Sequence, residues 1–404
     1  MRVLSCSWPI MRKQIENDSM RDVIVIGGGP AGNKVASLLA KDHSVLVVEE
    51  HNVTGHPVQC TGLVSDEVIE LSGVRPTILN KLYGANIFFP CGASISLRSK
   101  DHKAVLIDRY EFDGMMVTKA SDAGAEHVYS TRFLRHNIEK GVSAVTDRGS
   151  LTSRMLIGAD GHNSRLAKSI PGNRPAEYVR GIQADIRRTS EDQEMLNIRI
   201  GSKVAPGFFS WEIPFGDMIR VGLCTSWDAG PPSEYLKLLV KKIGFNEDDI
   251  VKKYSGRIPL GGQKKTYADN LLLVGDAACQ VKPISGGGLQ PAFRSSYCLA
   301  ETVREAFDSN DFSERSLSVY EKRWKREIGR ELKRGYRLRK VYNGMSDRDL
   351  DKVLRIADRR NIKEIFNEGS IDHPSDLLLP VLNDPITAVR LLPLLTKAMV
   401  RGIK

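Results

Sequence analysis

A glycine-rich turn near the N-terminus is the first feature whose residue types and spacing can do chemistry. It begins at Gly27 and reads Gly-Gly-Gly-Pro-Ala-Gly, a G-x-G-x-x-G pattern between an apolar run and a helical one. In such a turn Gly27 permits the tight bend, Gly29 lets backbone approach a pyrophosphate, and Gly32 lets helix and strand pack closely. The helix N-terminus around Ala31 offers N–H groups to phosphates. Glu49 follows the next apolar run, where a carboxylate can accept hydrogen bonds from a ribose, so we expect a dinucleotide site.

The elements that must hold this turn can be read from the hydrophobic pattern around it. Residues 22–26 and 45–48 are short apolar runs, which is typical of strands buried on both faces. Residues 34–41, between them, carry apolar side chains at helical spacing. Two later apolar runs, 155–157 and 271–274, enter polar turns in the same way. This βαβ opening predicts a parallel sheet covered by helices.

The middle of the chain has a different pattern. Between residues 181 and 254, apolar and polar side chains alternate, as in half-exposed antiparallel strands. The sequence therefore predicts an α/β fold (α+β overall), with a discontinuous Rossmann-type FAD/NAD(P)-binding domain, an inserted antiparallel β-sheet substrate domain and a helical C-terminal region. The expected parts are an N-terminal extension (1–20), the first part of the dinucleotide-binding domain (21–180, with an excursion near 81–103 toward the substrate domain), the β-rich substrate domain (181–254), the second part of the dinucleotide-binding domain (255–309) and a basic helical region (310–404).

Two further motifs indicate which dinucleotide is bound. Residues 158–165 read Gly-Ala-Asp-Gly-His-Asn-Ser-Arg, and Gly275-Asp276 precedes a glycine run at 286–288. Together with the first turn, these motifs resemble the glutathione-reductase-like flavoproteins, in the branch that includes the aromatic hydroxylases. The resemblance implies FAD as the cofactor. It also implies that Asp276 binds the ribityl chain, and that the helix starting at Leu289 directs its positive end toward the pyrimidine edge of the flavin.

The same resemblance implies further contacts with FAD. Arg109, at an expected helix start, matches a family arginine near the cofactor, and a surface arginine is the plain alternative. Backbone near Arg132 corresponds to an adenine contact. The full set of implied cofactor-binding residues is Gly27, Gly29, Ala31, Gly32, Glu49, Cys60, Thr61, Gly62, Leu63, Arg109, Arg132, Asp276, Gly287, Gly288 and Leu289.

Two segments narrow the branch of flavoproteins. Where aromatic hydroxylases usually carry an arginine-containing segment, this chain has Cys60-Thr61-Gly62, which resembles the geranylgeranyl reductase family (digeranylgeranylglycerophospholipid reductase-like), whose cysteine lies near the flavin. Residues 206–214 read Pro-Gly-Phe-Phe-Ser-Trp-Glu-Ile-Pro and fit that family's P-x-x-Y-x-W-x-F-P pattern. Phe209 replaces the tyrosine and has no hydroxyl, so no proton-donor role can be transferred to it.

The resemblance implies an FAD-dependent reductase that saturates isoprenoid C=C bonds, typically in geranylgeranyl chains of archaeal-type ether lipids or a related polyprenyl compound. An unactivated alkene that accepts a hydride also needs a proton delivered in concert, and an apolar tunnel to align it. Cys60 is open to several roles, as a proton donor, a pocket residue or a disulfide partner of Cys279 or Cys298, with simple packing as the alternative. The candidate catalytic residues are Cys60, Phe209 and Trp211, and the candidate tunnel residues are Phe208, Phe209, Trp211, Pro214 and Phe215, for which core packing is the alternative.

Three other functions compete with this interpretation. An FAD-dependent aromatic hydroxylase or monooxygenase belongs to the same broad family. A flavin halogenase is suggested by residues 209–214, which resemble W-x-W-x-I-P, and by Lys81, at roughly the position of a halogenase lysine. The third is a non-enzymatic flavoprotein that binds lipid or nucleic acid through a basic helix. Oxygen consumption during turnover separates the first two from a reductase.

Composition and charge set further limits. Six cysteines without paired spacing predict no metal site. The formal charge is +10, and residues 322–340 hold ten basic residues against two acidic ones. Apolar residues recur there every four positions, so this helix suits an anionic membrane surface, with a solvated face as the alternative. Nucleic acid is not an expected partner, because no fold signature for it is present.

Other expectations concern location, electron supply and the C-terminus. No apolar run is long enough to cross a bilayer, so we expect a cytoplasmic protein, peripheral on the membrane through 322–340. The electron donor is open among ferredoxin, a reduced quinone and NAD(P)H. Pro380, Pro385 and Pro393 interrupt the apolar stretches around 377–379 and 391–395, which predicts short buried helices near the C-terminus.

Overall fold

The computed structural model describes residues 20–139, 141–356, 367, 369–375 and 385–402. The expected extension, apart from Met20, lies outside these residues. One sheet carries the dinucleotide-binding part, with β1 at its centre and parallel to its neighbours. Its strands are β17 (Tyr267–Ala268), β18 (Leu271–Leu273), β11 (Gly149–Gly158), β1 (Arg21–Ile26), β2 (Val45–Val48) and β8 (Glu126–Val128), with β9 (Phe133–Glu139) and β10 (Gly141–Thr146) paired beyond β11.

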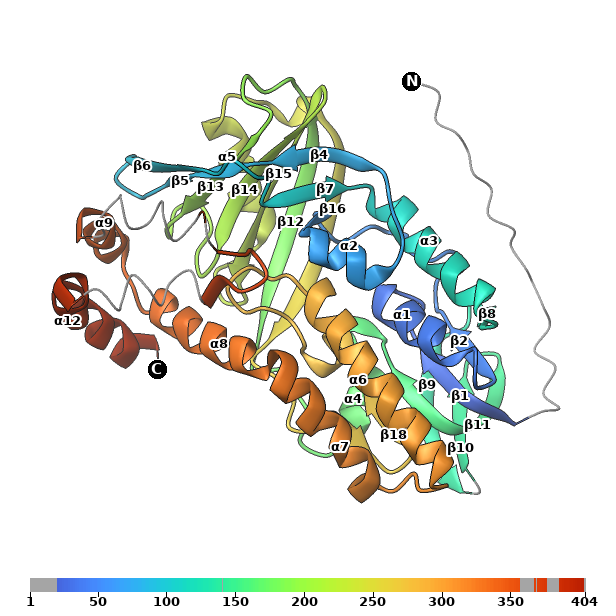
Figure 1. Cartoon of the computed structure of the whole chain (residues 1–404). Coiled ribbons are helices and arrows are strands. Elements are labelled where there is room, and N and C mark those ends of the chain that lie inside the picture. Colours follow the sequence, from blue (N-terminus) through green and yellow to red (C-terminus); the bar gives the residue numbers. More distant parts are fainter. Residues whose placement is uncertain (1–19, 140, 357–366, 368, 376–384, 403–404) are drawn as a thin grey trace.

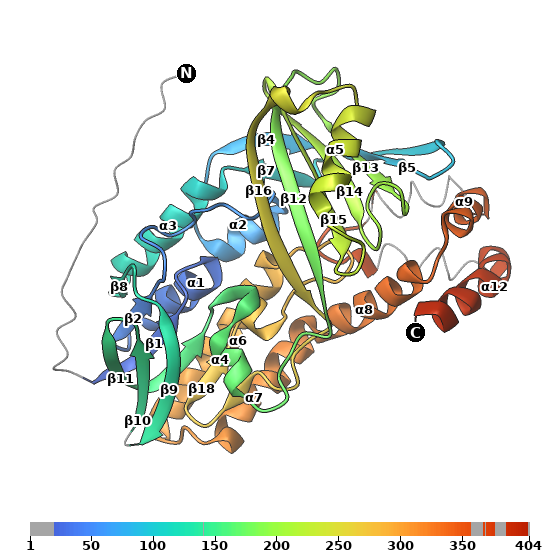
Figure 2. The same cartoon turned by 180° about the vertical axis from the view of Figure 1, so that it is seen from behind.

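Alternation along β1 shows why this sheet is buried on both faces. Val23 and Val25 pack with one core cluster under helices α1 (Pro30–Leu39) and α6 (Leu289–Asp308). Ile24 and Ile26 pack with another cluster under the antiparallel meander β9–β10–β11. Figure 1 shows the helical face and Figure 2 the meander on the opposite face. Because β1 is apolar at every one of these positions, it suits the centre of a covered parallel sheet.

A second, mixed sheet stands beside the first (Figure 1). Its strands, in spatial order, are β16 (Ile250–Leu260), β12 (Glu177–Arg187), β15 (Met218–Ser226), β14 (Phe209–Phe215), β13 (Met195–Ile200), β5 (Gly84–Phe88) and β6 (Ser94–Arg98). All neighbouring pairs are antiparallel except β13 with β5. The hairpin β5–β6 therefore joins this sheet from a much earlier part of the chain.

Shorter elements join the two sheets and cover them. A small sheet has the order β3 (Leu63–Val64), β7 (Ala104–Ile107), β4 (Ile78–Leu82). The remaining helices before the C-terminal region are α2 (Asp66–Ser72), α3 (Arg109–Asp122), α4 (Arg165–Ser169) and α5 (Pro232–Lys242), and the one-turn 3₁₀ helices are η1 (Gly161–Asn163), η2 (Glu247–Asp249) and η3 (Gly275–Ala278).

The C-terminal region is a helical arm along one edge of the molecule (Figure 1). It runs through α7 (Glu314–Trp324), the π-helical turn η4 (Lys325–Gly329), α8 (Arg330–Asn343), α9 (Asp347–Ile356) and α12 (Pro385–Gly402). The prediction of short buried helices around Pro393 was wrong. Helix α12 is continuous through Pro393, because a helix can lose one backbone hydrogen bond at proline and still be held by packing, and Leu392 is 61% exposed.

Candidate active site

The first glycine turn has the geometry of a phosphate cradle. Gly27 has φ of +103°, and a Cβ there would lie 2.3 Å from the carbonyl oxygen of Ala159. A Cβ at Gly32 would lie 2.0 Å from the oxygen of Gly27, so neither position admits a side chain. At Gly29, by contrast, a Cβ would meet nothing within 4 Å. The space beside Gly29 faces the start of α1, where no side chain caps the helix, so the free N–H groups point to a ligand.

Glu49 lies directly after β2 and is buried at 8% exposure. Its Oε2 accepts a hydrogen bond of 2.7 Å from the Gly28 N–H, and its Oε1 accepts one of 2.9 Å from the His51 N–H. These bonds fix the carboxylate beside the phosphate cradle, where its remaining lone pairs suit ribose hydroxyls. Arg132 is nearby, because the N–H of the preceding Thr131 donates to the Glu49 carbonyl. Its adenine contact stays a prediction.

The second fingerprint, the motif at residues 158–165, has a structural use that the sequence does not reveal. Oδ1 of Asp160 accepts from the Ser164 hydroxyl at 2.5 Å, and Oδ2 accepts from the Arg165 N–H at 2.8 Å. Both bonds are local, and they fix the start of α4. Asp160 therefore stabilises the turn after β11 and holds the backbone opposite Gly27, where Ala159 excludes any side chain.

The third fingerprint, Gly275-Asp276 with the glycine run 286–288, brings a carboxylate to the start of a long helix. Asp276 lies in η3, and its Oδ1 is 3.1 Å from the position of a Cβ on Gly288, the N-cap of α6. No side chain caps α6, so the N–H groups near Leu289 are available, as the sequence predicted for a helix that faces the flavin. Burial raises the pKa of Asp276 to about 6, and the charge of Arg109 opposes that rise.

These features fit FAD as the group held between the two helix starts. The open space at Gly29 suits a pyrophosphate, Glu49 suits the ribose, and Asp276 beside α6 suits the polyhydroxyl chain and the flavin. Ala31 completes the contact between the fingerprints, because a Cβ at Gly275 would lie 3.0 Å from the Ala31 Cβ. The geometry thus brings the first and third motifs together around one ligand.

The Cys60 turn lies against the arginine predicted near the cofactor. Gly62 has φ of +83°, and a Cβ there would be 2.6 Å from the Ile107 oxygen and 3.2 Å from Cγ of Arg109. Arg109, at 8% exposure, forms an ion pair with buried Asp113 at 2.9 Å. Burial lowers the pKa of Arg109, but the interactions with Asp113 and then with Cys60 outweigh the effect of burial, so the pKa of Arg109 is raised overall. Cys60 is half-buried and its thiol is free, as are those of Cys279 and Cys298.

The aromatic segment of β14 presents its odd-numbered residues to this turn. Phe209, Trp211 and Phe215 are half-buried and lie on one face of the strand, because side chains alternate. Trp211 and Phe209 meet edge to face at 6.1 Å between ring centroids. Phe208 is buried at 2% exposure and stacks on Phe209 at 4.6 Å, while Pro214 is on the opposite face of β14. The roles of these five residues in a tunnel stay predictions.

Several polar residues at the site were missed by sequence reasoning. Arg220 in β15 and Asp185 in β12 are cross-strand partners, and Arg220 also donates to the Thr61 carbonyl at 2.6 Å. The Thr61 hydroxyl donates to Oε1 of Gln183 at 3.0 Å. Opposite charges within the alternating region 181–254 were the available signal, but the pairing and register of its strands were not readable.

A second missed group joins the C-terminal region to the site. Lys282, at 5% exposure, lies between Asp276 and the glycine run 286–288 and pairs with Asp372, at 1% exposure. Asp372 also accepts a hydrogen bond from the Ser65 hydroxyl, and Ser65 is the N-cap of α2 just after the Cys60 turn. Residues near the C-terminus thus fix two loops of the site at once.

Within the described residues, no group of three or more histidine, cysteine or acidic side chains has the arrangement of a metal site. The same residues include no helix long and apolar enough to cross a bilayer. Lys81 is exposed on β4, whereas a halogenase lysine must lie at the inner end of a tunnel, so its position gives the halogenase alternative no support.

The chain is similar to known proteins over most of its length. Residues 20–228 match the family described as FAD binding domain. The chain is 32% identical over 387 residues to digeranylgeranylglycerophospholipid reductase 2 of Methanothermobacter thermautotrophicus, covering 90% of this chain and 99% of the relative. It is 31% identical to digeranylgeranylglycerophospholipid reductase 1 of Methanococcoides burtonii, over 83% of this chain and 88% of the relative.

Solved structures show the same fold. A geranylgeranyl bacteriochlorophyll reductase-like protein from Thermoplasma acidophilum superposes with a TM-score of 0.81 at 24% identity, covering 93% of this chain and 99% of that one. The halogenase PltM, solved with FAD, gives a TM-score of 0.67 at 16% identity over 95% of this chain and 92% of that one. Fold and site together define an FAD-binding flavoprotein. Among such flavoproteins, the chain belongs to the digeranylgeranylglycerophospholipid reductase family.

Proposed function

We propose that this protein is an FAD-dependent reductase that saturates C=C bonds in the geranylgeranyl chains of a digeranylgeranylglycerophospholipid. The relatives in the family are named for that activity. The observation that carries the proposal is the apposition of the Cys60 turn to the aromatic face of β14, since both belong to the family's pattern and Thr61 is hydrogen-bonded to the sheet that bears Trp211.

Bound and reduced, FAD supplies a hydride equivalent to the alkene. The chain's own residues must then align the alkene, exclude water and deliver a proton. Phe209, Trp211 and Phe215 provide an apolar face for an isoprenoid chain, which has no polar group to hydrogen-bond. Cys60 has a free, half-buried thiol in a turn that is bonded to the same sheet, so it is the candidate proton donor.

An anaerobic single-turnover experiment tests this proposal. The flavin is reduced with dithionite, the geranylgeranyl lipid is added, and flavin absorbance is followed in the absence of oxygen. The reductase predicts that the oxidised-flavin spectrum returns on addition of the lipid. If oxidation occurs only after oxygen is admitted, the reductase proposal fails, and an oxygen atom found in the product would favour the hydroxylase or monooxygenase alternative.

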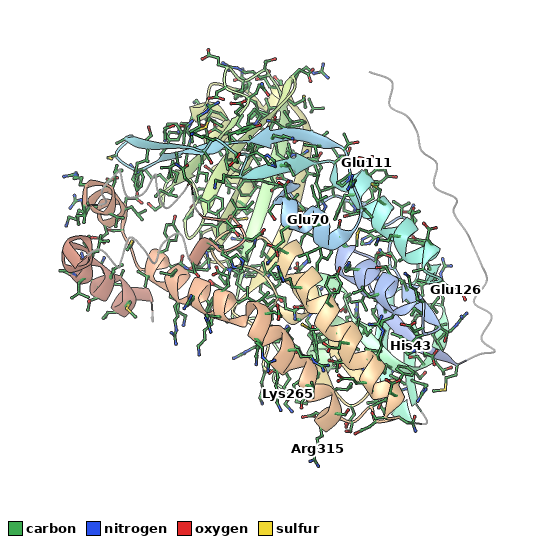
Figure 3. The ribbon with its side chains drawn as sticks, viewed as in Figure 1. His43, Glu70, Glu111, Glu126, Lys265 and Arg315 are labelled. Carbon is green, nitrogen blue, oxygen red and sulfur yellow. The ribbon has the colours of Figure 1, made fainter. Side chains whose placement is uncertain are left out.

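Peripheral contact with an anionic membrane is the second part of the proposal. Six exposed cations, from Lys322 to Lys340, follow one side of α7, η4 and α8 at spacings of three or four residues. In the described part of the chain, no carboxylate forms an ion pair with the five cations that precede Lys340. Buried Tyr320, Trp324 and Ile328 lie on the opposite side. Figure 3 shows side chains projecting from this edge, with Arg315 at its outer end. The cations are Lys322, Arg326, Arg330, Lys333, Arg337 and Lys340.

Helix α12 adds apolar side chains beside this cationic edge. It packs on the end of α8, where a Cβ at Gly402 would be 2.2 Å from the Lys340 oxygen. Leu392, Met399 and Val400 are 61%, 52% and 62% exposed. Exposed apolar residues next to these cations suit the interface of an anionic bilayer, in which the lipid substrate resides.

A further inference from the structure

The turn at Cys60 is held between two arginines from different parts of the fold. Arg109 begins α3 of the FAD-binding part, and Arg220 lies in β15 of the second sheet. A Cβ built on Gly62 would be 3.2 Å from Cγ of Arg109 and 3.7 Å from Nη1 of Arg220. The turn therefore fills the space between the two side chains, and only glycine fits at its closest point.

Arg220 is itself fixed before it reaches the turn. Its Nε and Nη2 donate to Oδ1 and Oδ2 of Asp185 at 2.7 and 2.9 Å, and the Tyr254 hydroxyl donates to the same Oδ2 at 2.9 Å. Two parallel bonds between a guanidinium and a carboxylate define the plane of the guanidinium. The remaining nitrogen, Nη1, donates to the Thr61 carbonyl oxygen at 2.6 Å. The sheet thus determines where Thr61 lies.

A second bond completes the attachment of the turn. The Thr61 hydroxyl donates to Oε1 of Gln183, a residue of β12 that is 3% exposed. Next to it, the Gly62 N–H donates to the sulfur of Cys60 at 3.5 Å. Because Thr61 is bonded through both backbone and side chain, Cys60 has little freedom to shift without breaking a buried contact.

Electrostatics supports the same arrangement. Burial lowers the pKa of Arg220, but the hydrogen bonds and charge of Asp185, followed by Tyr254 and Cys60, raise it overall. Cys60 also contributes to the raised pKa of Arg109, after Asp113. The contacts of Gly62 place this turn beside both arginine side chains.

We propose that Arg220, held by Asp185 and Tyr254, is a positioning residue for the reaction: it fixes the Cys60–Gly62 turn on the substrate sheet and so sets where the Cys60 sulfur lies relative to the alkene. The catalytic part of this proposal, the effect on the reaction, rests on the proposed reductase function. The structural part concerns the turn alone and is testable without substrate.

Hydrogen exchange of the full-length FAD-loaded protein tests the structural part. In Arg220→Met, amides of residues 60–64 should exchange about tenfold faster or more, while β15 keeps its protection. Arg199→Met is the matched control, because Arg199 forms another half-buried pair on this sheet, 2.8 Å from Glu212, without touching the turn. If Arg220→Met does not fold, Asp185→Asn and Arg220→Lys take its place, because each weakens the contacts by which Arg220 holds the turn. Wild-type exchange at residues 60–64 in every folded variant would overturn the proposal.

A double-mutant cycle tests the catalytic part. Arg220→Met should lower kcat about tenfold and leave KM within about twofold, and in a Cys60→Ala background it should change kcat less than about twofold. An equal loss of kcat in both backgrounds would show that Arg220 does not act through Cys60, and would overturn this part. If no alkene reduction is found at all, the reductase function fails, and the exchange experiment still decides the positioning role.

Discussion

The Nζ atom of Lys282 lies 2.6 Å from Oδ1 of Asp372, and the two side chains are 6% and 2% exposed. The pair joins the loop between Asp276 and Gly286 to residues near the C-terminus. A Cβ at Gly287 would be 2.9 Å from Cε of Lys282, so the lysine packs directly beneath the glycine run that precedes α6. With the Ser65 bond to the same carboxylate, the pair makes the C-terminal region part of the cofactor site's support.

Removal of one member of this pair should destabilise the protein strongly. Asp372→Asn leaves the Lys282 charge buried without a counter-charge, which costs about 3–5 kcal/mol of unfolding free energy. Urea unfolding of the FAD-free protein measures the loss. Glu305→Gln is the control, because the Glu305–Arg323 pair is more exposed and contributes at most about 1 kcal/mol. A loss in Asp372→Asn no larger than in the control would contradict the buried-pair account.

Gly29 and Gly32 lie in the same turn, but substitution by alanine should impair FAD binding at one and folding at the other. Gly29→Ala places a methyl group in open space, so the FAD-free protein keeps its stability while FAD binding weakens by about tenfold or more, because the pyrophosphate needs that space. Gly32→Ala brings a Cβ to 2.0 Å from the Gly27 oxygen, so the fold itself is destabilised. Thermal unfolding and FAD titration separate the two effects. Unchanged FAD affinity in Gly29→Ala would place the pyrophosphate elsewhere.

The buried carboxyl of Asp276 predicts a pH dependence. Its folded-state pKa of about 6 is above the unfolded value, so its contribution to stability is full below that unfolded value and is lost as the pH rises through about 6. Relative to Asp276→Asn, the FAD-free wild type should lose at most about 3 kcal/mol of unfolding free energy between pH 4 and pH 8. Denaturant unfolding at several pH values measures this. A wild-type-to-variant difference that stays constant over this range would refute the prediction.

The cationic edge should govern binding to anionic vesicles. Reversing three of its charges, with Arg326→Glu, Arg330→Glu and Lys333→Glu, should abolish salt-sensitive co-sedimentation with phosphatidylglycerol vesicles. The control reverses Lys237, Lys241 and Lys242 on α5, which gives the same net charge on another face. Equal loss in both triple variants would indicate a general charge effect and remove the case for a dedicated surface. Duplex DNA bound more tightly than vesicles would favour the nucleic-acid alternative.

How far the sequence predicts this site depends on whether the signal is local. The turn from Gly27 to Gly32, Glu49 and Asp276 were predictable, because each belongs to a short strand–turn–helix pattern whose geometry is fixed by neighbours in the chain. The structure places Arg109 beside the Cys60 turn, and its contact with the cofactor stays a prediction. These local motifs make up most of the FAD site that we predict.

The supporting polar groups were not predictable in the same way. Asp185 and Arg220 meet only because β12 and β15 pair in one register, and a shift of one residue would turn them to opposite faces. Asp372 reaches Lys282 across ninety residues of sequence. No local pattern encodes such contacts, so only the three-dimensional arrangement reveals them.

The most direct test of the central claim is the mass of the lipid after anaerobic turnover. Purified protein, reduced with dithionite, is incubated with digeranylgeranylglycerophospholipid, and the product is analysed by mass spectrometry. The reductase assignment predicts mass gains in increments of two hydrogens, up to the number of double bonds, and a slower but measurable gain with Cys60→Ala if that thiol delivers the proton. A lipid of unchanged mass beside flavin that stays reduced would contradict the assignment.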